Sequence, residues 1–149
     1  MICLMSADRM SLETLSRCEA VGLLASATIG RVVFTVAALP AVVPVTFAVR
    51  DDAIVLRTSA ETRLAVAADG GVLAFEVDEV DPQKRTGWSV VVTGIAEVVT
   101  DPVKCAVIRS AVDPLVPGQH EIHVRLPLTV VTGRRIADPA ASGPLRVIG

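Results

Sequence analysis

The sequence predicts a mainly β fold, a β-barrel to which two or three small helices are added. Apolar residues make up 52% of the 149 residues and lie largely in Val-rich runs of strand length, bounded by short turn signals. Only three segments between these runs favour helix. Six or more strands with short connections and few helices are typical of a barrel, and this length fits one domain over residues 1–149.

The elements are expected in the following order. The runs of strand character cover residues 23–27, 30–37, 41–49, 53–58, 71–81, 88–99, 120–126 and 128–135. The helical segments cover residues 11–22, 60–68 and 101–115, the last opened by Asp101 as N-cap with Pro102 behind it. Turns are expected at Leu39-Pro40 and Asp51-Asp52, and Gly94 is a candidate for a bulge or a close backbone approach. The tail from about residue 137 is expected to be flexible.

Charge and hydropathy exclude several function classes. A net charge of −2 gives no electrostatic reason to expect a nucleic-acid partner. Residues 32–49 carry no charge and are nearly long enough to span a membrane, but Pro40 and Pro44 interrupt any helix there. The amino terminus lacks the apolar core of a signal peptide. Three widely spaced cysteines indicate a reduced, cytoplasmic setting without a membrane partner.

The junction LRTSAETRLAVAADGG, residues 56–71, has two compatible interpretations. Thr58 and Glu61 have the spacing of a capping box, which predicts that Thr58 caps the helix that follows. The same hydroxyls with Arg57 and Arg63 also have the chemistry of an anion site, because guanidinium and helix-start N–H groups bind phosphate. A cap can line such a site, so both interpretations stay open.

The order of several motifs along most of the chain resembles one protein family. The segments GRVVFTV, PVTF, TSAETRL, AFEVDE and WSVVVTG follow one another as they do in the pyridoxamine 5'-phosphate oxidase-like, FMN-binding split barrels. The sequence is most similar to the actinobacterial branch related to nitroimidazole-resistance proteins. This resemblance implies a six- to seven-stranded antiparallel split β-barrel that forms a homodimer with the cofactor at the interface.

The resemblance also implies which residues meet the cofactor. Residues of the PVTF segment would lie along the flavin ring, those of RTSAETRL would face its phosphate, and the WSV strand would complete the pocket, often from the other subunit. The cofactor-binding residues implied in this way are Pro44, Val45, Thr46, Phe47, Arg57, Thr58, Ser59, Arg63, Leu64, Trp88 and Ser89.

The function implied is that of an FMN-dependent oxidoreductase acting on an unknown small molecule, with NADPH or NADH as a transient electron donor. The flavin would supply the chemistry, and no catalytic acid or base stands out. The alternatives are a flavin-binding or sensing protein without turnover, a deazaflavin-dependent reductase and a barrel without a cofactor.

The other candidate groups give weaker evidence for a functional site. The acidic run Glu76–Asp81 is expected to be a solvated strand edge, and no residues complete a metal site with His120 and His123. Arg134 and Arg135 are weak candidates for the flavin pocket. No motif for nucleophilic catalysis or for a Rossmann dinucleotide site is present in the sequence.

Overall fold

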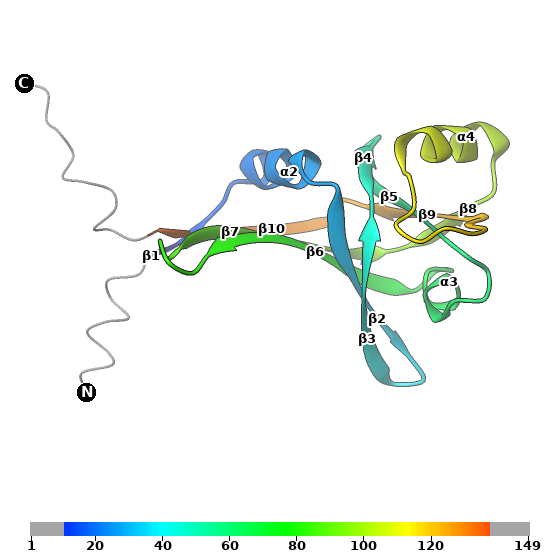
Figure 1. The fold of residues 1–149 in the computed structure, drawn as a ribbon, viewed down its shortest axis with the longest axis horizontal. Coiled ribbons are helices and arrows are strands. Elements are labelled where there is room, and N and C mark those ends of the chain that lie inside the picture. The colour runs from blue at the N-terminus through cyan, green and yellow to red at the C-terminus, as the bar shows by residue number, and fades with distance from the viewer. Residues whose placement is uncertain (1–10, 138–149) are drawn as a thin grey trace, which may run out of the picture.

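The chain folds into two antiparallel sheets with three helices, as described by a computed structural model for residues 11–137 (Figure 1). The six-stranded sheet has the order β1 (Ser11–Thr14), β10 (Val130–Ala137), β7 (Thr86–Ile95), β6 (Val72–Asp81), β2 (Ile29–Val36) and β3 (Leu39–Thr46). The four-stranded sheet has the order β4 (Ala48–Arg50), β5 (Ala53–Thr58), β9 (Ile122–Pro127) and β8 (Glu97–Val99). The helices are α2 (Arg17–Ser26), α3 (Arg63–Ala67) and α4 (Pro102–Ala111). The predicted β-rich split-barrel class is confirmed, whereas the expected flexible tail lies outside the described residues.

The described part has ten strands, more than expected, because two predicted strands pass from one sheet to the other. Residues 41–49 were expected to be one strand, but the chain leaves β3 at Phe47 and continues as β4 in the small sheet. Residues 88–99 divide in the same way at Ala96, between β7 and β8. Phe47 and Ala96 are both buried, so each crossing point also closes the interior between the sheets.

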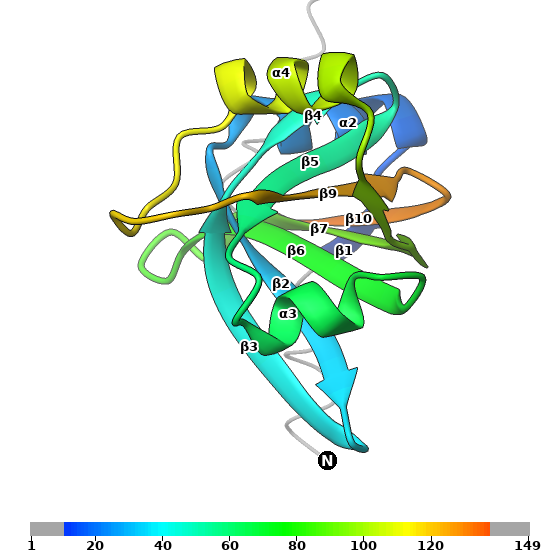
Figure 2. The same cartoon turned by 90° about the vertical axis from the view of Figure 1, so that its right-hand side faces the viewer.

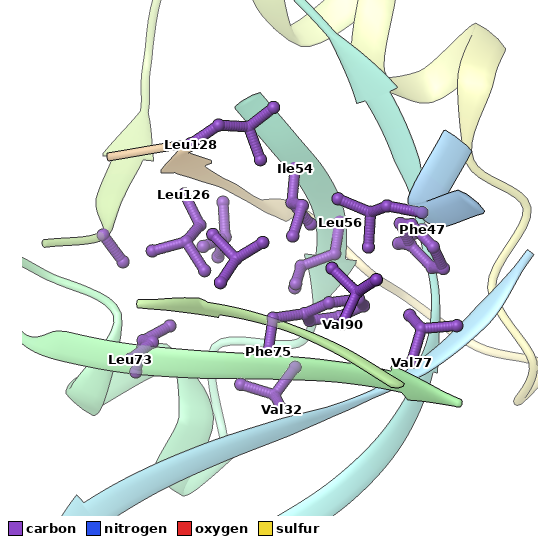
Figure 3. Packing of buried hydrophobic residues seen from close by; sticks show 14 of the residues in the cluster. Val32, Phe47, Ile54, Leu56, Leu73, Phe75, Val77, Val90, Leu126 and Leu128 are labelled. Atoms are coloured by element: carbon purple, nitrogen blue, oxygen red, sulfur yellow. The ribbon is translucent and has the colours of Figure 1, made fainter. Parts of the chain in front are cut away.

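The interior is a continuous apolar cluster between the two sheets (Figure 3). Phe75 of β6 and Leu56 of β5 are fully buried there, and Phe47 meets Phe75 edge to face with ring centroids 4.7 Å apart. Each such side chain contributes roughly 1.5–3 kcal/mol through burial. Leu64 brings α3 into the same cluster, and Leu24 does the same for α2.

Two hairpin turns use residues with positive φ. Asp51 and Asp52, at φ 49° and 60°, connect β4 to β5 as predicted. The turn expected at Leu39-Pro40 is instead made by Ala37 and Ala38, at φ 51° and 64°. Positive φ at both central residues matches the twist of a two-residue hairpin. Pro40 lies within β3, which is the edge of its sheet, where the missing N–H of proline is tolerated.

The first helix begins later than predicted. Residues 11–14 form β1 rather than helix, and residues 23–26 belong to α2 rather than to a strand. Ser16 and Glu19 form the capping box that starts α2. A side chain added at Gly133 of β10 would come within 3.0 Å of Ala20, so this glycine allows α2 to pack closely on the sheet.

Two further predictions hold. Asp101 caps α4 through the N–H of Lys104, with Pro102 as the first helical residue. A side chain at Gly94 would lie 3.1 Å from the carbonyl oxygen of Pro127, which is the close backbone approach expected there. Within residues 11–137, no helix has the length and apolar character needed to cross a membrane.

Candidate active site at the edge of the large sheet

A groove with a volume of about 490 Å³ lies where the edge strand β3 meets the end of β5. Its walls are formed by residues 43–46 of β3, residues 57–59, Glu61 and Thr62 at and after the end of β5, and residues 114–121 between α4 and β9. Figure 2 shows α4 above β4 and β5, with the chain descending from α4 into β9. A volume of this size is within the range of small-molecule and cofactor sites.

Arg57 connects two walls of the groove. Its Nε donates a hydrogen bond to the carbonyl oxygen of His120, and its Nη1 donates one to the carbonyl oxygen of Val112, each at 3.3 Å. A guanidinium carries five N–H donors, so Arg57 keeps donors and its positive charge for a ligand. The side chain therefore both anchors the segment after α4 and contributes a cation to the groove.

The β3 wall is tied to the same segment. Thr46 Oγ1 donates a hydrogen bond of 2.6 Å to the carbonyl oxygen of Asp113. Pro44 and Val45 lie beside Thr46 and supply apolar surface. An edge strand with an apolar surface opposite the guanidinium of Arg57 suits a ligand with a flat apolar part and an anionic end.

The predicted capping box at Thr58 and Glu61 is wrong. The N-cap of α3 is Thr62, whose hydroxyl accepts a hydrogen bond from the N–H of Ala65, and the helix begins only at Arg63. Thr58 Oγ1 lies 2.8 Å from Thr62 Oγ1 and so supports the cap instead of making it. Residues 59–62 form a short connecting segment, which the helical pattern of residues 60–68 did not reveal.

The groove brings together six of the eleven residues that the resemblance implied: Pro44, Val45, Thr46, Arg57, Thr58 and Ser59. Phe47 and Leu64 do not line it, because they are only 4% and 3% exposed and belong to the interior. Arg63 is also absent from its walls. Phe47 lies at the crossing from β3 to β4, where its ring packs into the interior against Phe75.

Trp88 and Ser89 lie on β7, away from these walls. Trp88 pairs with Glu79 and Arg135 across the strands and lines a second cleft of about 360 Å³ with them. Ser89 points to the other side of the sheet, where it pairs with Asp78 and Arg134. Arg135 donates a hydrogen bond to Glu19 at 3.4 Å.

The segment 114–121 is the part of the groove that the sequence did not predict. Residues through Leu115 were assigned to a helix, but α4 ends at Ala111. Leu115 and Val116 are exposed apolar residues of this wall. The turn-forming Pro114, Pro117 and Gly118 were the available signal for a loop.

The two histidines occupy different surroundings. His120 lines the groove, and its Nε2 lies 2.6 Å from the carbonyl oxygen of Val116, which can only accept. Nε2 therefore carries the proton. His123 is buried on β9, and burial lowers its pKa, with Arg57 and Arg109 lowering it further. Among residues 11–137, no group of three potential metal ligands comes together.

The acidic run is not a strand edge. β6 lies between β7 and β2, and Arg31 of β2 bridges Glu76 and Asp78, with N–O distances of 3.6 Å to each. Burial, followed by the neighbouring Asp78, raises the pKa of Glu76 to about 7. Glu76 and Asp78 thus form, with Arg31, a charged group within the outer surface of the large sheet.

Comparison with known proteins places the chain in a family. The family model described as pyridoxamine 5'-phosphate oxidase matches residues 16–135. This range includes both sheets almost completely and the whole groove. The chain belongs to the pyridoxamine 5'-phosphate oxidase family. The resemblance inferred from the motif order is confirmed.

Relatives within this family come from several bacteria. An uncharacterized protein of Mycobacterium tuberculosis is 46% identical over 127 residues, which cover 82% of this chain and 84% of that protein. The solved structure of the FAD-binding protein from Mycobacterium smegmatis is 35% identical with a TM-score of 0.70, covering 83% of this chain and 97% of that one.

A more distant solved structure shares the fold. A Bacteroides thetaiotaomicron protein assigned to 5-nitroimidazole antibiotic resistance has a TM-score of 0.66. It is 13% identical and covers 85% of this chain and 89% of its own. At this identity, the match concerns the family fold alone.

Proposed function

We propose that this protein binds a flavin in the groove and acts as a flavin-dependent oxidoreductase on a small molecule. The groove supports this most directly, because it joins Arg57, Thr58 and Ser59 to the apolar wall of Pro44 and Val45. These are residues that the family resemblance assigns to the two ends of the cofactor. FAD binding by the Mycobacterium smegmatis relative, at 35% identity, supports a flavin as the ligand.

The chemistry of the groove walls fits such a cofactor. Arg57 would pair with phosphate, and the Ser59 hydroxyl, which has no hydrogen-bond partner among the described residues, would donate to it. Pro44, Val45 and Leu115 would cover the apolar ring system. Bound flavin supplies hydride transfer, and the protein supplies binding and orientation.

The proposed cofactor is FMN, with NADPH or NADH as the transient electron donor. Deazaflavin is the alternative to be tested beside it. This proposal assigns no acid–base step to a side chain of the groove. The role of this chain in the reaction would be to hold the flavin and shape the substrate space above it.

We further propose that the protein acts as a homodimer through the outer face of the large sheet. This outer face is the side away from the interior. Figure 1 shows α2 over β7 and β10 on the opposite side of the sheet. Seven apolar side chains of the outer face are each more than half exposed: Leu12, Ile29, Val42, Val72, Val80, Ile95 and Val130. Apolar surface on this scale is typical of an interface, and a partner would bring its own Ser89, which lies on this face.

Absorbance spectra of the purified protein, with and without added FMN, FAD or deazaflavin, test the cofactor. We expect saturable binding of a flavin and a roughly tenfold weaker affinity in Ser59→Ala, since one hydrogen bond to a charged group is lost. Thr100→Ala, exposed directly after β8 and outside the groove, is the matched control. Absence of binding by every flavin would overturn the proposal.

Turnover and assembly need separate measurements. Anaerobic reduction of the bound flavin by NADPH, followed by reoxidation with candidate acceptors, tests the enzyme, and binding without reduction would favour a sensor.

Sedimentation tests the dimer: Val130→Glu should give a monomer, whereas Val103→Glu on the exposed side of α4 should not. A monomeric wild type would exclude the homodimer.

A further inference from the structure

The carboxylate of Glu121 occupies an anion position inside the groove. Its Oε1 accepts a hydrogen bond of 3.1 Å from the backbone N–H of Ala60. Ala60 directly follows Arg57, Thr58 and Ser59, the residues proposed to receive phosphate. The N–H of Ala60 is thus a donor at the phosphate end of the groove, and a side chain of the protein already uses it.

Glu121 is held there as an ionised group. Hydrogen bonds from its own N–H and from the N–H of Ala60 lower its pKa, with a smaller contribution from His120. A carboxylate that accepts two backbone N–H groups is an electrostatic equivalent of one edge of a phosphate. At neutral pH it therefore contributes a negative charge where a phosphate oxygen would bind.

We propose that Glu121 is an internal competitor for the phosphate of the flavin, so that phosphate reaches Ala60 only when the Glu121 side chain swings away. This inference rests on the proposed function. Glu121 would then determine specificity, because its carboxylate would weaken the binding of the phosphate ester without affecting the binding of the flavin ring. Two anions cannot share one N–H, and like charges a few ångströms apart repel.

The surroundings of Glu121 allow this exchange. The residue is exposed and forms no ion pair among the described residues, so solvent can receive the displaced carboxylate. The consequence for affinity is specific: the phosphate should add less to flavin binding in the wild type than in a variant that lacks the Glu121 carboxylate. The preference for FMN over riboflavin should therefore be about tenfold weaker in the wild type than in Glu121→Gln.

Glu61 provides a matched control. It lines the same groove and carries the same charge, but no hydrogen bond ties its carboxylate to the described residues. If only the total charge of the groove mattered, neutralising either glutamate would have the same effect. If occupancy of the Ala60 N–H by Glu121 matters instead, only neutralising Glu121 should strengthen phosphate binding.

The experiment compares wild type, Glu121→Gln, Glu121→Ala and Glu61→Gln. Inorganic phosphate is titrated at pH 7.5 while the ¹⁵N resonance of the Ala60 amide is followed, and FMN and riboflavin affinities are measured by flavin fluorescence. Both Glu121 variants should bind phosphate at Ala60 about tenfold more tightly and raise the preference for FMN over riboflavin by a similar factor. Glu61→Gln should change each value less than about twofold. Glutamine keeps the size of the side chain, and melting curves verify that both variants fold.

The outcomes separate this inference from the proposed function. Equal phosphate binding at Ala60 in wild type and both Glu121 variants would overturn the inference, even if all proteins bind FMN. An equal gain in Glu61→Gln would overturn it as well. Tighter phosphate binding without any flavin binding would uphold the competition at Ala60 and overturn the flavin-dependent function.

Discussion

The groove and the interior are built from the same strands but are held together by different forces. Thr46 ends β3 at the groove, and the next residue, Phe47, is buried against Phe75. On β5, Leu56 belongs to the interior and Arg57 to the groove. The interior depends on apolar packing, whereas the groove depends on side chains that bind backbone carbonyl groups. Substitutions one position apart should therefore affect stability in one case and the ligand in the other.

Replacing Phe47 by Ala should have the largest effect. The change removes a buried ring and its contact with Phe75, so we expect a loss of about 3–5 kcal/mol in the free energy of unfolding. Urea denaturation measures it. A loss below about 1 kcal/mol combined with weaker flavin binding would instead assign Phe47 to the cofactor, against its position in the structure.

Arg57→Ala should affect both regions, because Arg57 anchors a wall as well as providing a cation. Loss of its bonds to the carbonyl groups of His120 and Val112 should cost about 1–3 kcal/mol of stability. Flavin affinity should fall at least tenfold. Arg57→Lys separates the roles, since it keeps the charge but cannot reproduce both hydrogen bonds. Full recovery by lysine would show that the anchoring bonds are unimportant.

Glu76→Gln tests the third surface, the outer face of the large sheet. Because the pKa of Glu76 is raised to about 7 in the folded protein, the folded state binds its proton more tightly than the unfolded state. Wild-type stability should fall as pH rises from about 4.5 to 7, and then level off. Glutamine should remove this fall and add about 1–2 kcal/mol at pH 8, with little change below pH 4.5.

Melting curves of both proteins between pH 4 and 9 measure the effect, with Glu79→Gln as control. Glu79 lies on the other side of β6, where it pairs with Trp88. Parallel pH profiles for wild type and Glu76→Gln would contradict the prediction.

Thr46→Val should have the smallest effect. Valine keeps the shape of threonine but loses the hydrogen bond to the carbonyl oxygen of Asp113, so stability should fall by about 0.5–1.5 kcal/mol. Faster amide exchange in residues 114–121 should accompany it. Thr35→Val, an exposed β2 position without such a bond among the described residues, is the control, and an equal effect there would contradict the assignment.

The sequence was sufficient to predict those helices, strands and turns that leave a local pattern in it. Apolar, β-rich runs predicted β5 and β6, and the pair Asp51-Asp52 and the Asp101 cap marked a turn and a helix start correctly. Crossing between sheets has no local signal, because a strand that changes sheets at Phe47 or Ala96 keeps the same composition.

The lining of the groove could be anticipated only in part, for a similar reason, and cofactor binding by these residues stays a prediction. Motif order singled out residues of the two walls on β3 and at the end of β5, but it could not separate Phe47 from Thr46 or decide which hydroxyl caps α3. Thr58, Ser59 and Thr62 all have suitable chemistry, and only the path of the chain selects Thr62. The third wall, residues 114–121, is brought to the groove by long-range bonds to Arg57 and Thr46, which no local pattern reveals.

The double attachment of Arg57 has an evolutionary consequence. A residue that anchors one wall through carbonyl groups cannot be exchanged to suit a new ligand without loosening that wall. Leu115, Val116 and Gln119 line the same groove, and their side chains form no hydrogen bond with the described residues. Divergence toward new substrates should therefore accumulate in these three positions while Arg57 stays fixed, so that one family fold can change its chemistry by altering a single short segment.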